Sequence, residues 1–235
     1  NDGEVMFIND DADVIINNGT ITGGYSNSEG GCLYIEGGAN VTLNNVHIVG
    51  NRVYNDDGAG IFMEEGSTLT MNGGSFENNE TSGNGKTSYY GGAIGINEAT
   101  ATFQDVLFKN NRNVSLGSAI YADDSEVTIT GCTFDGNGGG TSAIYGYDSV
   151  ITVKNSTFTN NGGSNLFELN FTDLIMDASA FHNNDHYYMI LPNLAATVQI
   201  TNSEFTDNTA GMMYVGWFAF MGDNFFKNCT FNNNQ

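Results

Sequence analysis

Positive charge is what this sequence lacks most. Its 235 residues include 6 Lys and Arg against 27 Asp and Glu, which gives a formal net charge of −21. A surface of this sign repels phosphate groups, so we expect neither nucleic acid nor an anionic membrane as a partner. Cations, neutral sugars and basic proteins are the partner classes that remain.

Proline, cysteine and long apolar runs are also scarce. The chain has one proline, Pro192, and three cysteines, Cys32, Cys132 and Cys229. This odd and widely spaced set fits neither a disulfide framework nor a zinc site. No apolar run approaches the roughly 18 residues of a membrane-spanning helix. The sequence begins without a charged and then apolar leader, so we expect any targeting signal to lie outside it.

Internal repetition dominates what is present. The motif Phe-x-x-Asn recurs at seven regularly spaced positions, and a variant that starts with isoleucine extends the series. Successive copies begin 23 to 32 residues apart. The pairs are Ile48/Asn51, Phe76/Asn79, Phe108/Asn111, Phe134/Asn137, Phe158/Asn161, Phe181/Asn184, Phe205/Asn208 and Phe231/Asn234.

Two further motifs complete each repeat. One is Gly-Gly-Ala-Ile, literal at 91–94 and degenerate elsewhere, and the other is an alternating triplet such as Val127-Thr128-Ile129. Each repeat therefore holds three short strands separated by Gly, Asn and Asp turns. One such repeat cannot bury a face, whereas repeats stacked in register form a continuous core. The sequence predicts an all-β fold: a single right-handed parallel β-helix of about eight or nine coils over residues 1–235.

The motif residues have predicted structural roles. The Phe of each Phe-x-x-Asn should point inward and stack on the Phe of the next coil, and the Asn should form a ladder of amides at a turn. Cys132 and Cys229 fall two residues before a motif Phe, in a column of small inward-facing residues. We interpret both as residues that fill space, not as ligands.

The paired motifs resemble the repeat of chlamydial polymorphic membrane proteins, which is named for Gly-Gly-Ala-Ile and Phe-x-x-Asn. The resemblance covers about residues 30 to 235. It implies a β-helix displayed outside the cell and used in adhesion, with a host surface protein or a glycan as the partner. The segment shows no autotransporter barrel, so a secretion route does not carry over.

Catalytic motifs are not apparent. A polysaccharide lyase needs a cationic base beside calcium, and no Lys or Arg falls on the outward face of the first strand. Of the four motifs of polygalacturonases, only Asp-Asp pairs occur, at 10–11, 56–57 and 123–124. The histidines His47, His182 and His186 have no metal-binding spacing. We therefore expect a non-enzyme; any catalysis would be of the polysaccharide lyase or hydrolase class.

Two surface columns are candidate binding sites. The first strand of each repeat presents an outward aromatic column that suits sugar stacking or protein contact, formed by Tyr34, Phe62, Tyr121 and Tyr145. The turn after this strand gathers acidic residues, and stacked acids repel one another unless a hard cation such as calcium bridges them. The weak metal site predicted there consists of Glu65, Glu98, Asp124 and Asp148. No other cofactor is expected.

The ends of the repeat array raise the question of assembly. Solenoids need polar caps, and the sequence provides none that we recognise. The stretch from 212 to 226 is strongly apolar, with Trp217, Phe218 and Phe220 as predicted self-association residues. The domain is then either a segment of a longer helix or a subunit that stacks head to tail into a filament.

From these patterns we expect an extracellular or cell-surface protein with a non-catalytic structural or adhesive role, and with end-to-end self-association as an extension of that role. The alternative is a carbohydrate-binding or carbohydrate-active module that uses the outward face of the first strand.

Overall fold

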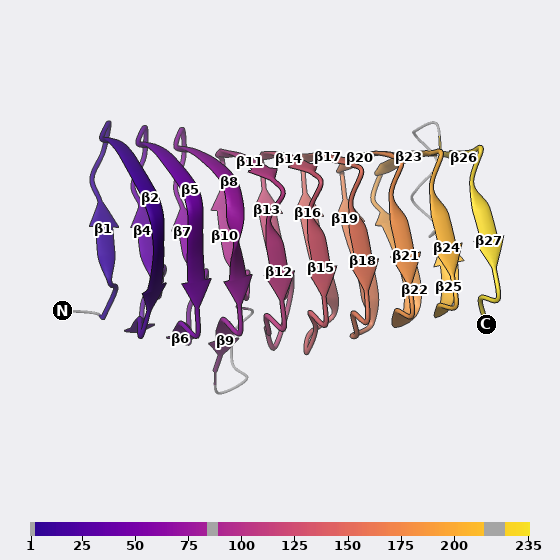
Figure 1. Cartoon of the computed structure of the whole chain (residues 1–235), viewed down its shortest axis with the longest axis horizontal. Helices are drawn as coiled ribbons and strands as arrows, with labels where there is room; N and C mark the ends of the chain where they lie inside the picture. Colours follow the sequence, from indigo (N-terminus) through magenta and orange to yellow (C-terminus); the bar gives the residue numbers. More distant parts are fainter. Residues whose placement is uncertain (1–2, 84–88, 214–223) are drawn as a thin grey trace.

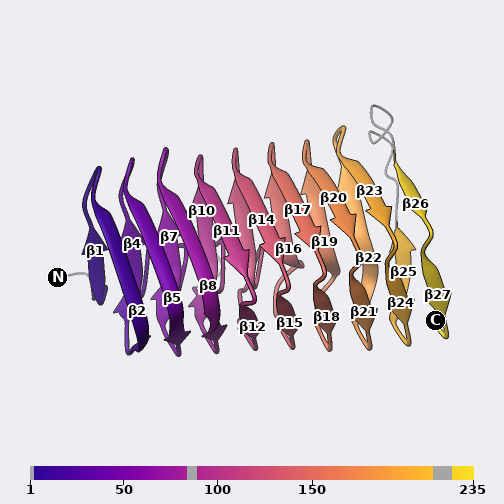
Figure 2. The same ribbon diagram turned by 45° about the horizontal axis from the view of Figure 1, so that its top comes forward.

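The computed structural model describes residues 3–83, 89–213 and 224–235 and contains only β-strands in these ranges. The chain winds into a rod in which each turn lies directly beside the previous one (Figures 1 and 2), and all strand pairs are parallel. The rod has about eight to nine turns, and the two chain termini lie at opposite ends of its long axis. This confirms the predicted all-β solenoid. No helix in the described ranges is long and apolar enough to cross a membrane.

The first sheet contains nine strands, one from each coil, stacked in chain order. It is formed by the Gly-Gly-Ala-Ile segments, as the repeats predict. Its strands are β1 (Met6–Ile8), β4 (Leu33–Ile35), β7 (Ile61–Met63), β10 (Ile94–Asn97), β13 (Ile120–Asp123), β16 (Ser142–Tyr147), β19 (Asn165–Asn170), β22 (Asp185–Asn193) and β25 (Thr209–Met213).

The second sheet contains fifteen strands and covers two faces of the rod. In the first coils one long strand runs across both faces: β2 (Asp13–Thr22), β5 (Asn40–Val49) and β8 (Thr68–Glu77). In later coils that strand is divided at the bend. Its first half is β11 (Thr100–Gln104), β14 (Glu126–Thr130), β17 (Val150–Lys154), β20 (Asp173–Asp177), β23 (Thr197–Thr201) and β26 (Phe225–Lys227). Its second half is β12 (Leu107–Lys109), β15 (Thr133–Asp135), β18 (Thr157–Thr159), β21 (Ala180–His182), β24 (Glu204–Thr206) and β27 (Thr230–Asn232).

A third, three-stranded sheet occurs beside the first coils: β3 (Tyr25–Ser26), β6 (Arg52–Tyr54) and β9 (Glu80–Ser82). The bend inside the second sheet is made by one residue in the left-handed backbone region, as at Asn45, Asp105 and Asn155. Asn and Asp adopt this conformation more readily than other residues with a side chain. The Asn- and Asp-rich composition therefore serves the bends between faces.

The core is a continuous column of stacked phenyl rings. The motif residues from Phe76 to Phe231 lie one above another, with neighbouring ring centroids 4.4 to 5.0 Å apart and ring planes within 11° of parallel. Beside them lies the predicted column of small residues, in which Cys132 is buried. Burial raises the pKa of the Cys132 thiol to about 11, which keeps it protonated and inert.

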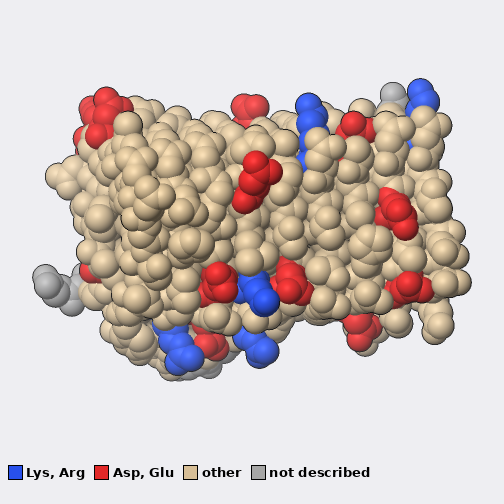
Figure 3. Space-filling view, in the orientation of Figure 1, with Lys and Arg blue, Asp and Glu red and all other residues tan. Residues whose placement is uncertain are grey.

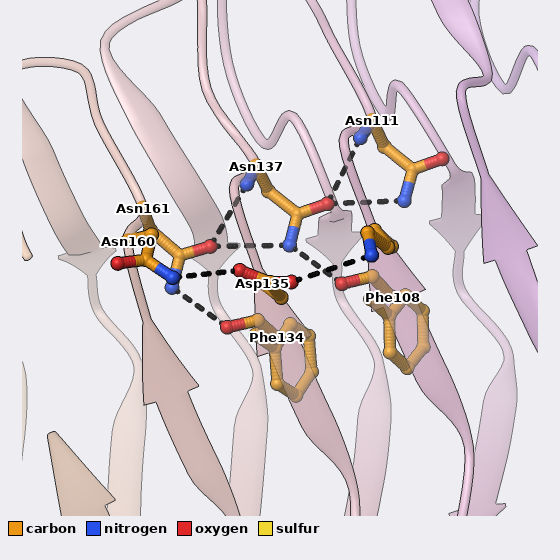
Figure 4. Close-up of polar contacts among 8 residues, drawn as sticks. Phe108, Asn111, Phe134, Asp135, Asn137, Asn160 and Asn161 are labelled. Carbon is orange, nitrogen blue, oxygen red and sulfur yellow. Dashed lines mark hydrogen bonds and ion pairs between the residues drawn. The ribbon is translucent and has the colours of Figure 1, made fainter. Parts of the chain in front are cut away.

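The motif asparagines form the predicted ladder (Figure 4). Each Oδ1 accepts hydrogen bonds from the backbone N–H and the side-chain amide of the asparagine in the preceding coil, as Asn137 does from Asn111, both at 3.0 Å. Each Nδ2 also donates to a motif carbonyl of the preceding coil, as Asn137 does to Phe108 at 2.9 Å. The buried turn thus has its polar groups satisfied without water.

Candidate functional site

The predicted aromatic column lies on the outer face of the first sheet, in register. Tyr34 pairs with Phe62 across β4 and β7, and Tyr121 pairs with Tyr145 across β13 and β16. The rings of Tyr121 and Tyr145 are parallel within 1°, with centroids 5.3 Å apart. The column is far less exposed than an outward position suggests, because Phe62 and Tyr145 are only 7 % and 8 % exposed.

Two residues that the sequence analysis missed complete the column. Phe7 stacks on Tyr34 with ring planes 3° apart, and Tyr90 stacks on Tyr121 with centroids 4.3 Å apart. The strand position between Phe62 and Tyr121 is Gly95, and a Cβ there would lie 3.0 Å from the Phe62 ring. Glycine at this position therefore leaves room for the neighbouring aromatic side chain. Tyr90 comes from the turn before β10, where alternation within a strand gives no signal.

The stacking determines what this face can bind. Sugar recognition by an aromatic residue uses an exposed ring face, whereas these rings cover one another and present mainly their edges. Their hydroxyl groups are also engaged: Tyr121 donates to Asp123 at 3.0 Å, and Tyr145 accepts from Asn170 at 2.9 Å. Burial raises the pKa of Tyr145 to about 12 and that of Tyr121 further. The column is suited to stiffening the sheet more than to stacking on a sugar.

The predicted acidic column lies at the turn between the first and second sheets. Glu98, Asp124 and Asp148 all have left-handed backbone conformations there, and Glu65 belongs to the same turn of an earlier coil. All four side chains are exposed. None belongs to a group of three ligand atoms close enough to share one ion among the described residues. Calcium binding by this column stays a prediction.

A different acidic cluster is the closest grouping in the described ranges. One carboxylate oxygen from each of Glu29, Asp56 and Asp57 lies within 4.8 Å of the others. Asp57 accepts a hydrogen bond from the backbone of Tyr90 at 2.7 Å, and Asp56 accepts one from the backbone of Asp57 at 3.1 Å. The sequence analysis noted the Asp56–Asp57 pair but not Glu29, which comes from the preceding coil. Such a cluster can share a proton or attract a cation.

Burial raises the pKa of all three carboxyl groups, and repulsion from neighbouring carboxylates raises those of Glu29 and Asp57 further. Desolvation is the largest cause for each, and it raises the pKa of Asp57 to about 7. Near neutral pH the folded protein then holds a proton that the unfolded chain releases at about pH 4. Stability should therefore increase as the pH falls from about 7 to about 4, and this increment is lost as the pH rises through 7.

We expect the Asp57→Asn variant to remove this pH dependence. Asparagine carries no charge at any pH, so the variant should nearly match the wild type at about pH 3.5, below the unfolded pKa, and exceed it at pH 8 by on the order of 3–4 kcal/mol. Urea unfolding at both pH values measures the difference. Asp207 is exposed and lies outside this cluster, and its Asn variant controls for the change in net charge. Equal pH slopes for Asp57→Asn and the wild type would contradict the prediction.

The comparison with known families gives one match. The family model described as "right handed beta helix region" matches residues 92–235, which is more than half of the chain. A sequence search of curated proteins finds no match.

Proposed function

From the premise that this chain belongs to the right-handed β-helix family, we propose that it is a non-catalytic extracellular scaffold with a structural or adhesive role. The observation that carries the proposal is the continuity of the two internal ladders. The phenyl column and the asparagine ladder both extend to the last coil. A rod built in this way holds its outer surface at fixed spacing, which is the property that a display scaffold requires.

The surface geometry supports a role without catalysis. Catalytic sites usually lie in concave pockets where groups with perturbed pKa values converge. On the outer face, the largest pKa shifts belong to tyrosines within the aromatic column, whose hydroxyl groups are hydrogen-bonded to Asp, Glu or Asn side chains. Packing within the column accounts for these pKa shifts. The resemblance to the chlamydial repeat is the finer part of the proposal, and it suggests cell-surface adhesion.

End-to-end assembly is less favoured by the geometry of the two edges. The C-terminal edge exposes Phe225 and Phe231, and Asn234 is the last asparagine of the ladder. At the N-terminal edge the ladder position is Gly24, whose backbone N–H donates to Asn51. Glycine has no side-chain oxygen that could accept a ladder hydrogen bond from Asn234 of another copy. The predicted self-association residues Trp217, Phe218 and Phe220 lie outside the described residues.

Acidic residues at the first coil also oppose end-to-end assembly. Asp10, Asp11 and Asp13 lie beside or within β2 at this edge and are exposed. Charged side chains on an edge strand oppose pairing with another chain. A head-to-tail contact would bring these acids near the next copy, which itself has a net charge of −21.

We therefore expect a monomer of 25.2 kDa in solution. Size-exclusion chromatography with light scattering at low and at physiological ionic strength measures the mass. At physiological ionic strength, exposed charges more than about 8 Å apart are largely screened, so a monomer at both ionic strengths would show that charge repulsion alone does not prevent assembly. Filaments under native salt would overturn the monomeric scaffold, and cleavage of a polyuronate with calcium present would overturn the non-catalytic role.

A further inference from the structure

One edge of the rod carries a groove that the scaffold role does not explain. The residue after each ladder asparagine falls on this edge, and bridges between coils link Glu80 to Arg112, Arg112 to Gly138 and Gly162 to Asp185. Several hollows occur along it, including two with distinct linings. The first is lined by Arg52, Asn78, Asn79, Glu80, Asn110 and Arg112. The second is lined by Gly162, Gly163, Asp185, His186, Tyr187 and Thr209. We call this feature the edge groove.

The first hollow is rich in hydrogen-bond donors. Arg52 forms an ion pair with Glu80 at 3.3 Å. Arg112 is exposed and, among the described residues, its guanidinium group has neither an ion pair nor a hydrogen bond. In Figure 3, basic side chains lie next to acidic ones along the lower edge of the rod, where Figure 1 places β6 and β9. The planar guanidinium of Arg112 is suited to bind one carboxylate through two hydrogen bonds.

The second hollow combines an aromatic ring with polar groups. Tyr187 is 78 % exposed and lies beside Asp185 and Thr209. His186 lines the same hollow and is 6 % exposed. Its Nδ1 lies 3.2 Å from the carbonyl oxygen of Gly163, which can only accept, so Nδ1 carries the proton.

The remaining nitrogen of His186 lacks a partner. Its Nε2 is buried, with no hydrogen-bond partner among the described residues, and burial lowers the pKa of His186 to about 4. The ring is therefore neutral at physiological pH, and Nε2 is an unsatisfied acceptor. A buried acceptor without a donor is unfavourable, and a ligand hydroxyl that reaches Nε2 would satisfy it.

The floor between the two hollows has no side chains. Gly138 and Gly162 occupy the edge in the two coils between Arg112 and Asp185. A Cβ added to Gly162 would meet nothing within 4 Å, so the space above this residue is open. Arg112 and Asp185 lie three coils apart, about 14 Å at the usual strand spacing. An extended ligand can therefore lie along the rod and reach both hollows.

We propose that the edge groove binds an oligosaccharide that carries a single carboxylate group. The carboxylate pairs with Arg112, the chain passes over Gly138 and Gly162, and a neutral sugar stacks on Tyr187 with its hydroxyl groups on Asp185 and Thr209. A polyuronate fits poorly, because Asp185 would repel a second carboxylate at the far end. This inference supplies a ligand for the proposed adhesive role, and the scaffold role stands without it.

Binding can be tested with the intact chain by isothermal titration calorimetry. The probes are a tetrasaccharide with one terminal glucuronate, the same compound with its carboxylate reduced to the alcohol, tetragalacturonate and an acidic peptide of similar length. We expect the single-carboxylate probe to bind at least tenfold more tightly than the other three. Loss of a charge-assisted hydrogen-bond pair in Arg112→Ala should weaken binding about 10- to 100-fold.

Three variants locate the site. Gly162→Trp, whose Cβ would meet nothing within 4 Å, should block the groove and abolish binding, while circular dichroism shows an unchanged fold. Lys154→Ala removes an exposed cation on another face and should bind as the wild type does. Tyr121→Ala tests the aromatic column and should also bind normally. The proposal is overturned if the wild type binds no probe, if Arg112→Ala or Gly162→Trp binds unchanged, if Tyr121→Ala alone loses binding, or if the peptide is preferred.

Discussion

Replacement of Asn137 by alanine is expected to lower the free energy of unfolding by about 3–5 kcal/mol. The side chain is fully buried. It accepts two hydrogen bonds from Asn111 and donates to Asn161 at 3.1 Å and to the carbonyl of Phe108 at 2.9 Å. Alanine leaves the Asn111 donors and the Phe108 carbonyl buried without partners, and each such group costs about 1–3 kcal/mol.

Two further variants separate hydrogen bonding from packing. Asn137→Asp keeps the shape and the acceptor, but it places a carboxylate opposite the Phe108 carbonyl and the Oδ1 of Asn161. Protonation of that carboxylate restores one donor, so this variant should recover part of its stability at low pH, and Asn137→Ala should not. Asn160→Gly is the matched control, because Asn160 is exposed, has a left-handed backbone and bonds to Asp135 outside the ladder. If Asn160→Gly and Asn137→Ala lowered the free energy of unfolding equally, the ladder would have no special role in stability.

Replacement of Phe134 by alanine should have an effect of similar size, with a loss of about 3–5 kcal/mol. The Phe134 ring is fully buried between the rings of Phe108 and Phe158, with centroid distances of 4.5 and 4.8 Å. A smaller residue leaves a cavity that the neighbouring coils cannot close, because their separation is fixed by strand hydrogen bonds. Phe134→Leu retains part of the volume and should lose less than Phe134→Ala.

The effect of Phe134→Ala should be measured separately for each coil. Each coil contacts only its neighbours, so a defect need not spread along the rod. Hydrogen exchange should show loss of protection in the coils that contain β12, β15 and β18, with protection of β5 and β24 retained. Ile175→Thr is the control, since Ile175 is exposed and the same column carries Thr152 in the preceding coil. Uniform loss of protection would show that the rod unfolds as one unit.

The repeats predicted the interior well because each ladder residue belongs to a short motif of fixed spacing. Phe134 and Asn137 are three residues apart in one strand and turn, so their inward and turn positions follow from the pattern alone. The length of the rest of the coil does not affect them. The same reasoning gave the register of Tyr121 with Tyr145.

The sequence did not predict how the turns before the first-sheet strands pack. Their lengths vary between coils, and side chains from them reach over the sheet. The burial of Phe62 depends on Gly95 being small, and Tyr90 stacks on Tyr121 from such a turn. The cluster of Glu29 with Asp56 and Asp57 likewise joins two turns of unequal spacing. The small third sheet was also not predicted, because β3, β6 and β9 are too short to show alternation.

The asparagine ladder has a direction. Each ladder asparagine from Asn51 to Asn208 donates a hydrogen bond from its Nδ2 to the Oδ1 of the ladder asparagine in the next coil toward the C-terminus. Each coil therefore offers the same donor on one side and the same acceptor on the other, so a duplicated coil could be inserted between any two without a new kind of interface. Gene duplication of one repeat would lengthen such a protein in steps of a single coil, and natural variants of different length would keep identical joints.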